Sequence, residues 1–172
     1  MEASSLRPTV LTRPTIMIVD DGEENLMIMK SILEGEFSVK LFSKAKFAIE
    51  YAFGNPPDLI LLDVMMPDID GYEACSILKE NERLVDIPVI FITSKDEDEY
   101  EEKGFAVGAS DFIHKPINAA ILISRVKTHL KIKIVMDYLR NENTRLKSGA
   151  QQASHQLEEV TKMLWGSSHQ KF

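Results

Sequence analysis

The chain has only one cysteine, Cys75, among its 172 residues, so it can form no internal disulfide. A lone cysteine is typical of proteins from reducing compartments. Apolar runs of the ~18 residues that a membrane span needs are also lacking, and the first residues include Glu2 but no apolar core, which excludes a secretory signal. We therefore expect a cytoplasmic protein with no membrane contact, and we interpret residues 1–13 as a disordered leader.

Positive charge is scarce in the first two thirds of the chain. Residues 1–116 carry 11 Lys and Arg against 23 Asp and Glu, whereas residues 117–172 carry 9 against 4. The overall composition, with 44% hydrophobic and 27% charged residues, is that of a globular rather than a disordered protein. The opposite charge balance of the two parts indicates that they have different roles.

Short apolar runs rich in β-branched residues alternate with stretches of helical spacing. The runs are residues 15–20, 37–42, 58–63, 88–93 and 111–114. Alternating strands and helices predict a parallel sheet that is covered on both faces. The first, third and fourth runs are apolar almost throughout and should be central, whereas the second alternates and should be an edge strand. The expected fold class is α/β, a doubly wound five-stranded parallel sheet of flavodoxin-like order 2-1-3-4-5, with an extended C-terminal helix.

After Pro116 no further strand pattern is present, and the remaining residues predict one long helix that Gly149 could interrupt. Apolar residues recur in steps of 3 and 4 from Ile132 to Leu164, with one stutter near Asn143. We favour a coiled coil that joins two copies over a helix that packs on its own domain, because the stripe exceeds the ~25 residues of an ordinary capped helix. The domains expected are the leader, a globular domain over 14–130 and a helical coiled-coil extension over 131–172.

Polar side chains stand where the predicted strands end: Asp20, Asp21, Asp63, Thr93 and Lys115. Because parallel strands end at the same edge of a sheet, these side chains should lie in one cleft. Three neighbouring carboxylates repel one another, and burial raises that cost further. A hard divalent cation with oxygen ligands would offset the repulsion, so Mg²⁺ is the cofactor that we predict, with the lysine as a second positive charge.

Asp63 is the predicted nucleophile, because it is the one acid that ends a central strand alone. A carboxylate can attack phosphorus to form an aspartyl phosphate, while the metal, the lysine and a hydroxyl stabilise the phosphoryl oxygens. The Met-Met-Pro turn that follows leaves the backbone carbonyl of Met65 free to help hold the ion.

Four motifs at these strand ends occur together: Asp20-Asp21, Asp63 followed by MMPDIDGYE, Thr93-Ser94, and Lys115-Pro116. In this combination they resemble the receiver domains of bacterial two-component response regulators, over about residues 14–130. The resemblance implies that a sensor histidine kinase or a phosphotransfer protein donates a phosphoryl group to Asp63. It also implies that Mg²⁺ lies among the three acids and the Met65 carbonyl.

The same resemblance implies a conformational switch. The Thr93 hydroxyl would move to the phosphoryl group, and the aromatic residue three positions before the lysine, Phe112, would turn inward into the space left behind. The surface of the fourth helix, fifth strand and fifth helix would then change, and a downstream output module or protein would read it. A near-complete switch requires ~5.5 kcal/mol of differential stabilisation.

Other functions fit the sequence less well, and we do not expect the chain to be an enzyme. A phosphatase with an aspartyl-phosphate intermediate is the alternative, but such enzymes want a second acid two residues after the nucleophile, where this chain has Met65. A flavin or nucleotide binder would need a Gly, Ser or Thr rich loop after the first strand, whereas residues 20–25 read DDGEEN. Direct nucleic-acid binding is not expected either, because the basic residues near the C-terminus are spread among apolar ones.

Overall fold

The computed structural model describes residues 13–94 and 98–165. Most of the predicted leader and the last seven residues of the predicted extension therefore lie outside the described residues. Two compact units make up the chain, residues Met1–Lys133 and Ile134–Phe172.

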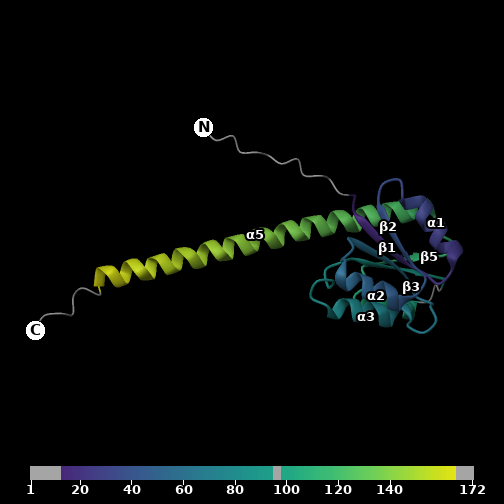
Figure 1. The fold of residues 1–172 in the computed structure, drawn as a ribbon, viewed down its shortest axis with the longest axis horizontal. Helices are drawn as coiled ribbons and strands as arrows, with labels where there is room; N and C mark the ends of the chain where they lie inside the picture. The colour runs from purple at the N-terminus through teal and green to yellow at the C-terminus, as the bar shows by residue number, and fades with distance from the viewer. Residues whose placement is uncertain (1–12, 95–97, 166–172) are drawn as a thin grey trace, which may run out of the picture. The chain divides into compact units, whose positions relative to one another are not determined.

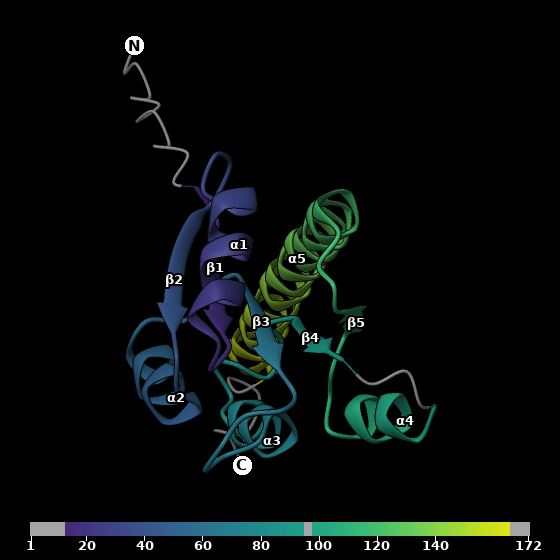
Figure 2. The same cartoon turned by 90° about the vertical axis from the view of Figure 1, so that its right-hand side faces the viewer.

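The first unit contains a five-stranded parallel sheet (Figure 2). Its strands are β1 (Thr15–Val19), β2 (Ser38–Phe42), β3 (Leu59–Asp63), β4 (Val89–Thr93) and β5 (Asp111–His114). Their order, β2-β1-β3-β4-β5, confirms the predicted topology. The residues of β3 and β4 are buried throughout, whereas those of β2 are half-buried or exposed, as expected of central and edge strands.

Helices cover both faces of the sheet: α1 (Glu23–Leu33), α2 (Ala45–Gly54), α3 (Gly71–Glu80), α4 (Asp98–Ala106) and the start of α5 (Ala119–Trp165). Successive side chains of a strand point to opposite faces. Met17 of β1 therefore joins a core cluster with residues of α2 and α3, while Ile16 and Ile18 join a second cluster with residues of α1 and α5. Two separate apolar layers thus fix the sheet between the helices.

Helix α5 is continuous from Ala119 to Trp165, so Gly149 does not interrupt it (Figure 1). At its start the Asn118 side chain accepts a hydrogen bond from the Ile121 N–H, which caps the helix. Three leucines of the predicted stripe are exposed in the single chain, namely Leu139 at 55%, Leu146 at 70% and Leu157 at 72%. Among the described helices, none combines the length and the apolar character needed to cross a membrane.

Candidate functional site

Asp63 is the last residue of β3 and is only 3% exposed. Its Oδ1 accepts a hydrogen bond of 3.1 Å from the Met65 N–H, while the Met65 side chain points to solvent and is 53% exposed. Burial raises the pKa of the Asp63 carboxyl, and the nearby Asp20 carboxylate adds to that rise, whereas the hydrogen bond from Lys115 opposes it. The structure thus places a carboxylate in a poorly solvated position at the end of a rigid central strand.

Asp20 follows β1 directly and is fully buried. Its Oδ1 accepts two hydrogen bonds, 2.8 Å from the Gly22 N–H and 2.9 Å from the Asn25 amide. Asp21 is exposed. Each of these two aspartates and Asp63 offers a carboxylate oxygen, and the three oxygens lie within 4.8 Å of one another.

Lys115 follows β5 and bridges the two buried acids. Its Nζ donates to Asp20 Oδ2 and to Asp63 Oδ2, both at 2.9 Å. Burial acts to lower the pKa of the Lys115 ammonium, but the hydrogen bonds to the two carboxylates outweigh it and raise that pKa. The lysine is therefore held in its charged form between two carboxylates that would otherwise repel each other.

The oxygen-rich cluster fits a hard divalent cation. Lys115 brings one positive charge to three aspartates, so the group keeps a negative balance even though two of its acids are buried. Mg²⁺ prefers carboxylate oxygens and retains waters on the side that faces solvent, and the exposed Asp21 lies on such a side. Burial of the other two acids would thereby become less costly.

Thr93 ends β4, next to Asp63 in the sheet, and is 2% exposed. Strand β4 pairs with β3 so that Ile92 is opposite Asp63, and the Lys115 N–H donates to the Thr93 carbonyl at 2.7 Å. The structure therefore brings the ends of β3, β4 and β5 together, as the sequence predicted.

Phe112 does not belong to this group of strand ends. It lies in β5 two residues before His114 and is 4% exposed. Its ring packs against Phe91, with centroids 5.5 Å apart, and against Phe105, with centroids 5.0 Å apart. The ring is thus already directed inward in this structure.

Three residues that shape the site were not recognised in the sequence. Gly22 and Asn25 hold the Asp20 side chain. Gly71 brings the start of α3 against the loop after β3, where its N–H donates to the Val64 carbonyl at 3.0 Å. Asp70 caps α3 by accepting a hydrogen bond from the Glu73 N–H. The glycine that directly follows this capping residue could have indicated a close approach of the backbone.

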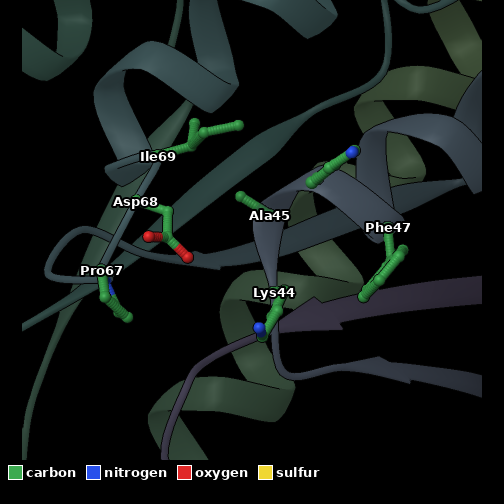
Figure 3. Close-up of a pocket in the computed structure, with 7 residues that line it drawn as sticks. Lys44, Ala45, Phe47, Pro67, Asp68 and Ile69 are labelled. Carbon is green, nitrogen blue, oxygen red and sulfur yellow. The ribbon is translucent and has the colours of Figure 1, made fainter.

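A separate cavity of about 340 Å³ lies between the first turn of α2 and the loop after β3 (Figure 3). Its lining combines apolar and charged side chains, namely Lys44, Ala45, Lys46, Phe47, Pro67, Asp68 and Ile69. None of the three clustered aspartates lines it. The cavity therefore does not form part of the acidic site.

Comparison with protein families matches residues 16–127 to the response regulator receiver domain. The match covers more than half of the chain, and the chain accordingly belongs to the response regulator receiver domain family of two-component phosphorelay signalling. The fold, with its 2-1-3-4-5 sheet, agrees with that assignment.

Individual relatives agree as well. A Vibrio cholerae protein named "Probable cyclic di-GMP phosphodiesterase" is 39% identical over 150 residues, which are 87% of this chain and 34% of that protein. Response regulator PleD of Caulobacter vibrioides is 39% identical over 126 residues, 73% of this chain and 28% of that protein. The solved structure of a two-component response regulator from Clostridium difficile has a TM-score of 0.64 at 29% identity and covers 69% of this chain and 96% of its own. The chain spans about a third of the length of the two curated relatives.

Proposed function

We propose that this chain is a phosphorylation-controlled switch in which Asp63 accepts a phosphoryl group from a sensor histidine kinase or a phosphotransfer protein. The observation that carries the proposal is the setting of Asp63, whose buried carboxylate is hydrogen bonded by Lys115 at one oxygen and by the Met65 N–H at the other. Such bonds hold both carboxylate oxygens in place at the edge of the sheet. The family match supports the general role of phosphoryl acceptor.

Transfer is a displacement at phosphorus. An oxygen of Asp63 supplies the electron pair of the new O–P bond, the N–P bond of the donor phosphohistidine breaks, and its electron pair returns to the imidazole nitrogen. Lys115, with its ammonium 2.9 Å from Asp63 Oδ2, stabilises the negative charge of the transferred group. The Thr93 hydroxyl, at the adjacent strand end, donates to a phosphoryl oxygen.

The cofactor in this proposal is Mg²⁺. Asp20, Asp21 and Asp63 would hold it through carboxylate oxygens, together with the backbone carbonyl of Met65. When bound, the ion neutralises charge on the phosphoryl oxygens. Two observations support this assignment. Carboxylate oxygens of the three aspartates lie within 4.8 Å of one another, and Lys115 leaves part of their negative charge uncompensated.

Output is proposed to pass through two surfaces. One is the face formed by α4, β5 and the start of α5, with Thr93 as the residue that responds to the phosphoryl group and Phe112 as the residue of β5 through which the change reaches α4. The other is the helical extension over 131–172, whose exposed leucines would pair with a second copy of the chain. An output module or partner protein would then read the state, and the relative named as a cyclic di-GMP phosphodiesterase suggests one such module.

Mass spectrometry of the intact protein tests the acceptor. With Mg²⁺ and acetyl phosphate, one phosphoryl group should accumulate, and Asp63→Asn should abolish it. Asp68→Asn is the matched control, because Asp68 lies outside the acidic cluster and asparagine tolerates its positive φ of 70°. Labelling that persists in Asp63→Asn would refute the proposal.

Two further measurements separate the alternatives. Release of many equivalents of phosphate per protein, without accumulation of the phosphorylated form, would favour the phosphatase. For the helical extension, sedimentation of residues 1–130 and of the full chain should give a monomer and a dimer, respectively. A full chain that stays monomeric at high concentration would remove the extension from the proposal.

A further inference from the structure

Gly104, a buried residue of α4, lies directly against the ring of Phe112 in β5. A β-carbon built on Gly104 would be 2.3 Å from Phe112 Cζ and 3.0 Å from Phe112 Cε1. It would also be 3.0 Å from Phe91 Cδ2. The first separation is far below van der Waals contact and the other two are tighter than ordinary contacts, so a side chain at position 104 would collide with the inward ring.

The ring is enclosed from several sides. Phe91 of β4, fully buried, and Phe105 of α4 contact it with interplanar angles of 50° and 76°. Tyr72 of α3 in turn packs edge-on against Phe91 at 5.3 Å. Aromatic pairs in tilted or edge-to-face geometry add favourable contacts beyond their buried area. Phe112 is thus one member of an aromatic cluster that joins α3, α4, β4 and β5.

Turning Phe112 outward would be costly for two reasons. The phenyl ring would become exposed to water without a hydroxyl that could form a hydrogen bond there. The space that it leaves would also stay empty, because Gly104 offers no atoms to fill it, and the lining of an unfilled cavity loses its contacts. A tyrosine facing a larger residue would not have this strong preference for the inward position.

We propose that Gly104 makes Phe112 a fixed support for α4, so that the ring stays inward whether or not Asp63 carries a phosphoryl group. Gly104 acts here as a positioning residue. Strand β5 and helix α4 lie next to each other (Figure 2). A change at the strand ends would then reach α4 through displacement of these two packed elements and not through rotation of the ring. The part about the phosphorylated state rests on the proposed function.

Solvent exposure of the ring in the resting protein is the first test. Phenylalanine labelled with ¹³C at the ζ carbon gives one signal per ring, and the Phe112→Leu variant identifies the signal of Phe112. On addition of a soluble gadolinium complex, that signal should broaden as little as the signal of Phe91, which is fully buried. Broadening like that of Phe47, which is 55% exposed, would overturn the proposal.

A double-mutant cycle tests the role of Gly104. Helix propensity alone predicts that Gly104→Ala stabilises α4, whereas the close contact predicts a rise of about tenfold or more in the unfolding equilibrium constant. In the Phe112→Leu background the shorter side chain should remove most of that rise. Gly35→Ala is the control, because a β-carbon there meets no atom within 4 Å. Equal effects of Gly104→Ala in both backgrounds, or a stabilisation, would refute the role of Gly104.

The phosphorylated state is examined in the same labelled protein, after intact mass has verified the added phosphoryl group. The Phe112 signal should remain as protected as before, while signals of α4 shift. Loss of protection would show that the ring rotates and would overturn the proposal. Failure to gain mass would instead count against the proposed function, and the exposure measurement and the cycle would still decide whether the ring is fixed.

Discussion

Gly71 lies so close to Asp63 that a β-carbon at position 71 would be 2.3 Å from the Asp63 carbonyl oxygen and 2.8 Å from the Val64 Cα. The first residue of α3 thus packs directly on the backbone that carries the proposed phosphorylation site. Because the neighbouring atoms belong to the main chain, they cannot move aside as a flexible side chain would.

Gly71→Ala should therefore push the loop after β3 away from α3. We expect a loss of ~1–3 kcal/mol in the free energy of unfolding and slower phosphorylation by acetyl phosphate, since the carboxylate of Asp63 would be displaced. Urea denaturation and intact mass measure the two effects. The control is Gly54→Ala, where a β-carbon meets no atom within 4 Å, and equal behaviour of the two variants would contradict the prediction.

Lys115→Gln should destabilise the protein most when no divalent cation is present. The substitution leaves Asp20 and Asp63 buried beside each other without the ammonium that bridges them, and loss of a charged hydrogen-bond partner costs ~1–3 kcal/mol. Millimolar Mg²⁺ should recover part of the loss, because the cation would replace the missing charge. Thermal unfolding with and without Mg²⁺ checks this, with the exposed Lys46→Gln as control. A deficit that Mg²⁺ leaves unchanged would argue against the cation site.

Asp111 should contribute stability that depends on pH. Burial acts to raise the pKa of its carboxyl, but hydrogen bonds from Arg125, His129 and the Phe112 N–H outweigh it and lower that pKa below the ordinary 3.8. A carboxyl group whose pKa is lower in the folded state than in the unfolded state stabilises the folded state at pH values above the unfolded-state pKa. This contribution disappears as the pH falls through the folded-state pKa.

Asp111→Asn should accordingly reduce the free energy of unfolding by ~1 kcal/mol near neutral pH, and the difference from the unchanged chain should shrink below about pH 4. Urea titrations between neutral and acidic pH measure it. A difference that grows as the pH falls would have the wrong sign. The exposed Asp68→Asn serves as the comparison.

Cys75 should be nearly inert while the protein is folded. Burial raises the pKa of its thiol from 9.0 to about 11, although the nearby Lys79 opposes the shift. At pH 8 the thiolate fraction is then about a hundredfold lower than in the unfolded chain, and the thiolate is the reactive form. Iodoacetamide labelling, followed by mass, should be slow in buffer and fast in urea. Equal rates in the two solvents would show that the thiol is accessible.

Much of the fold and of the site could be predicted from the sequence. The alternation of apolar runs and helical stretches led to the correct strand order, because a buried parallel strand needs an uninterrupted apolar run and a crossover helix. The convergence of Asp20, Asp63 and Lys115 followed from the same logic, since parallel strands end at one edge. Asn25 was not predicted, because its bond to Asp20 depends on how the loop before α1 folds.

The class of sheet, its central strands and the acids at their ends follow from the order of the amino acids alone, because hydrophobic periodicity and the alternation of strands with helices can be recognised along the chain. How closely the elements approach one another is known only from the folded structure. The contacts of Gly71 with Asp63 and of Gly104 with Phe112 join residues that no periodicity relates. Their physical basis is a packing distance, and a packing distance is settled only when every neighbouring element is in place.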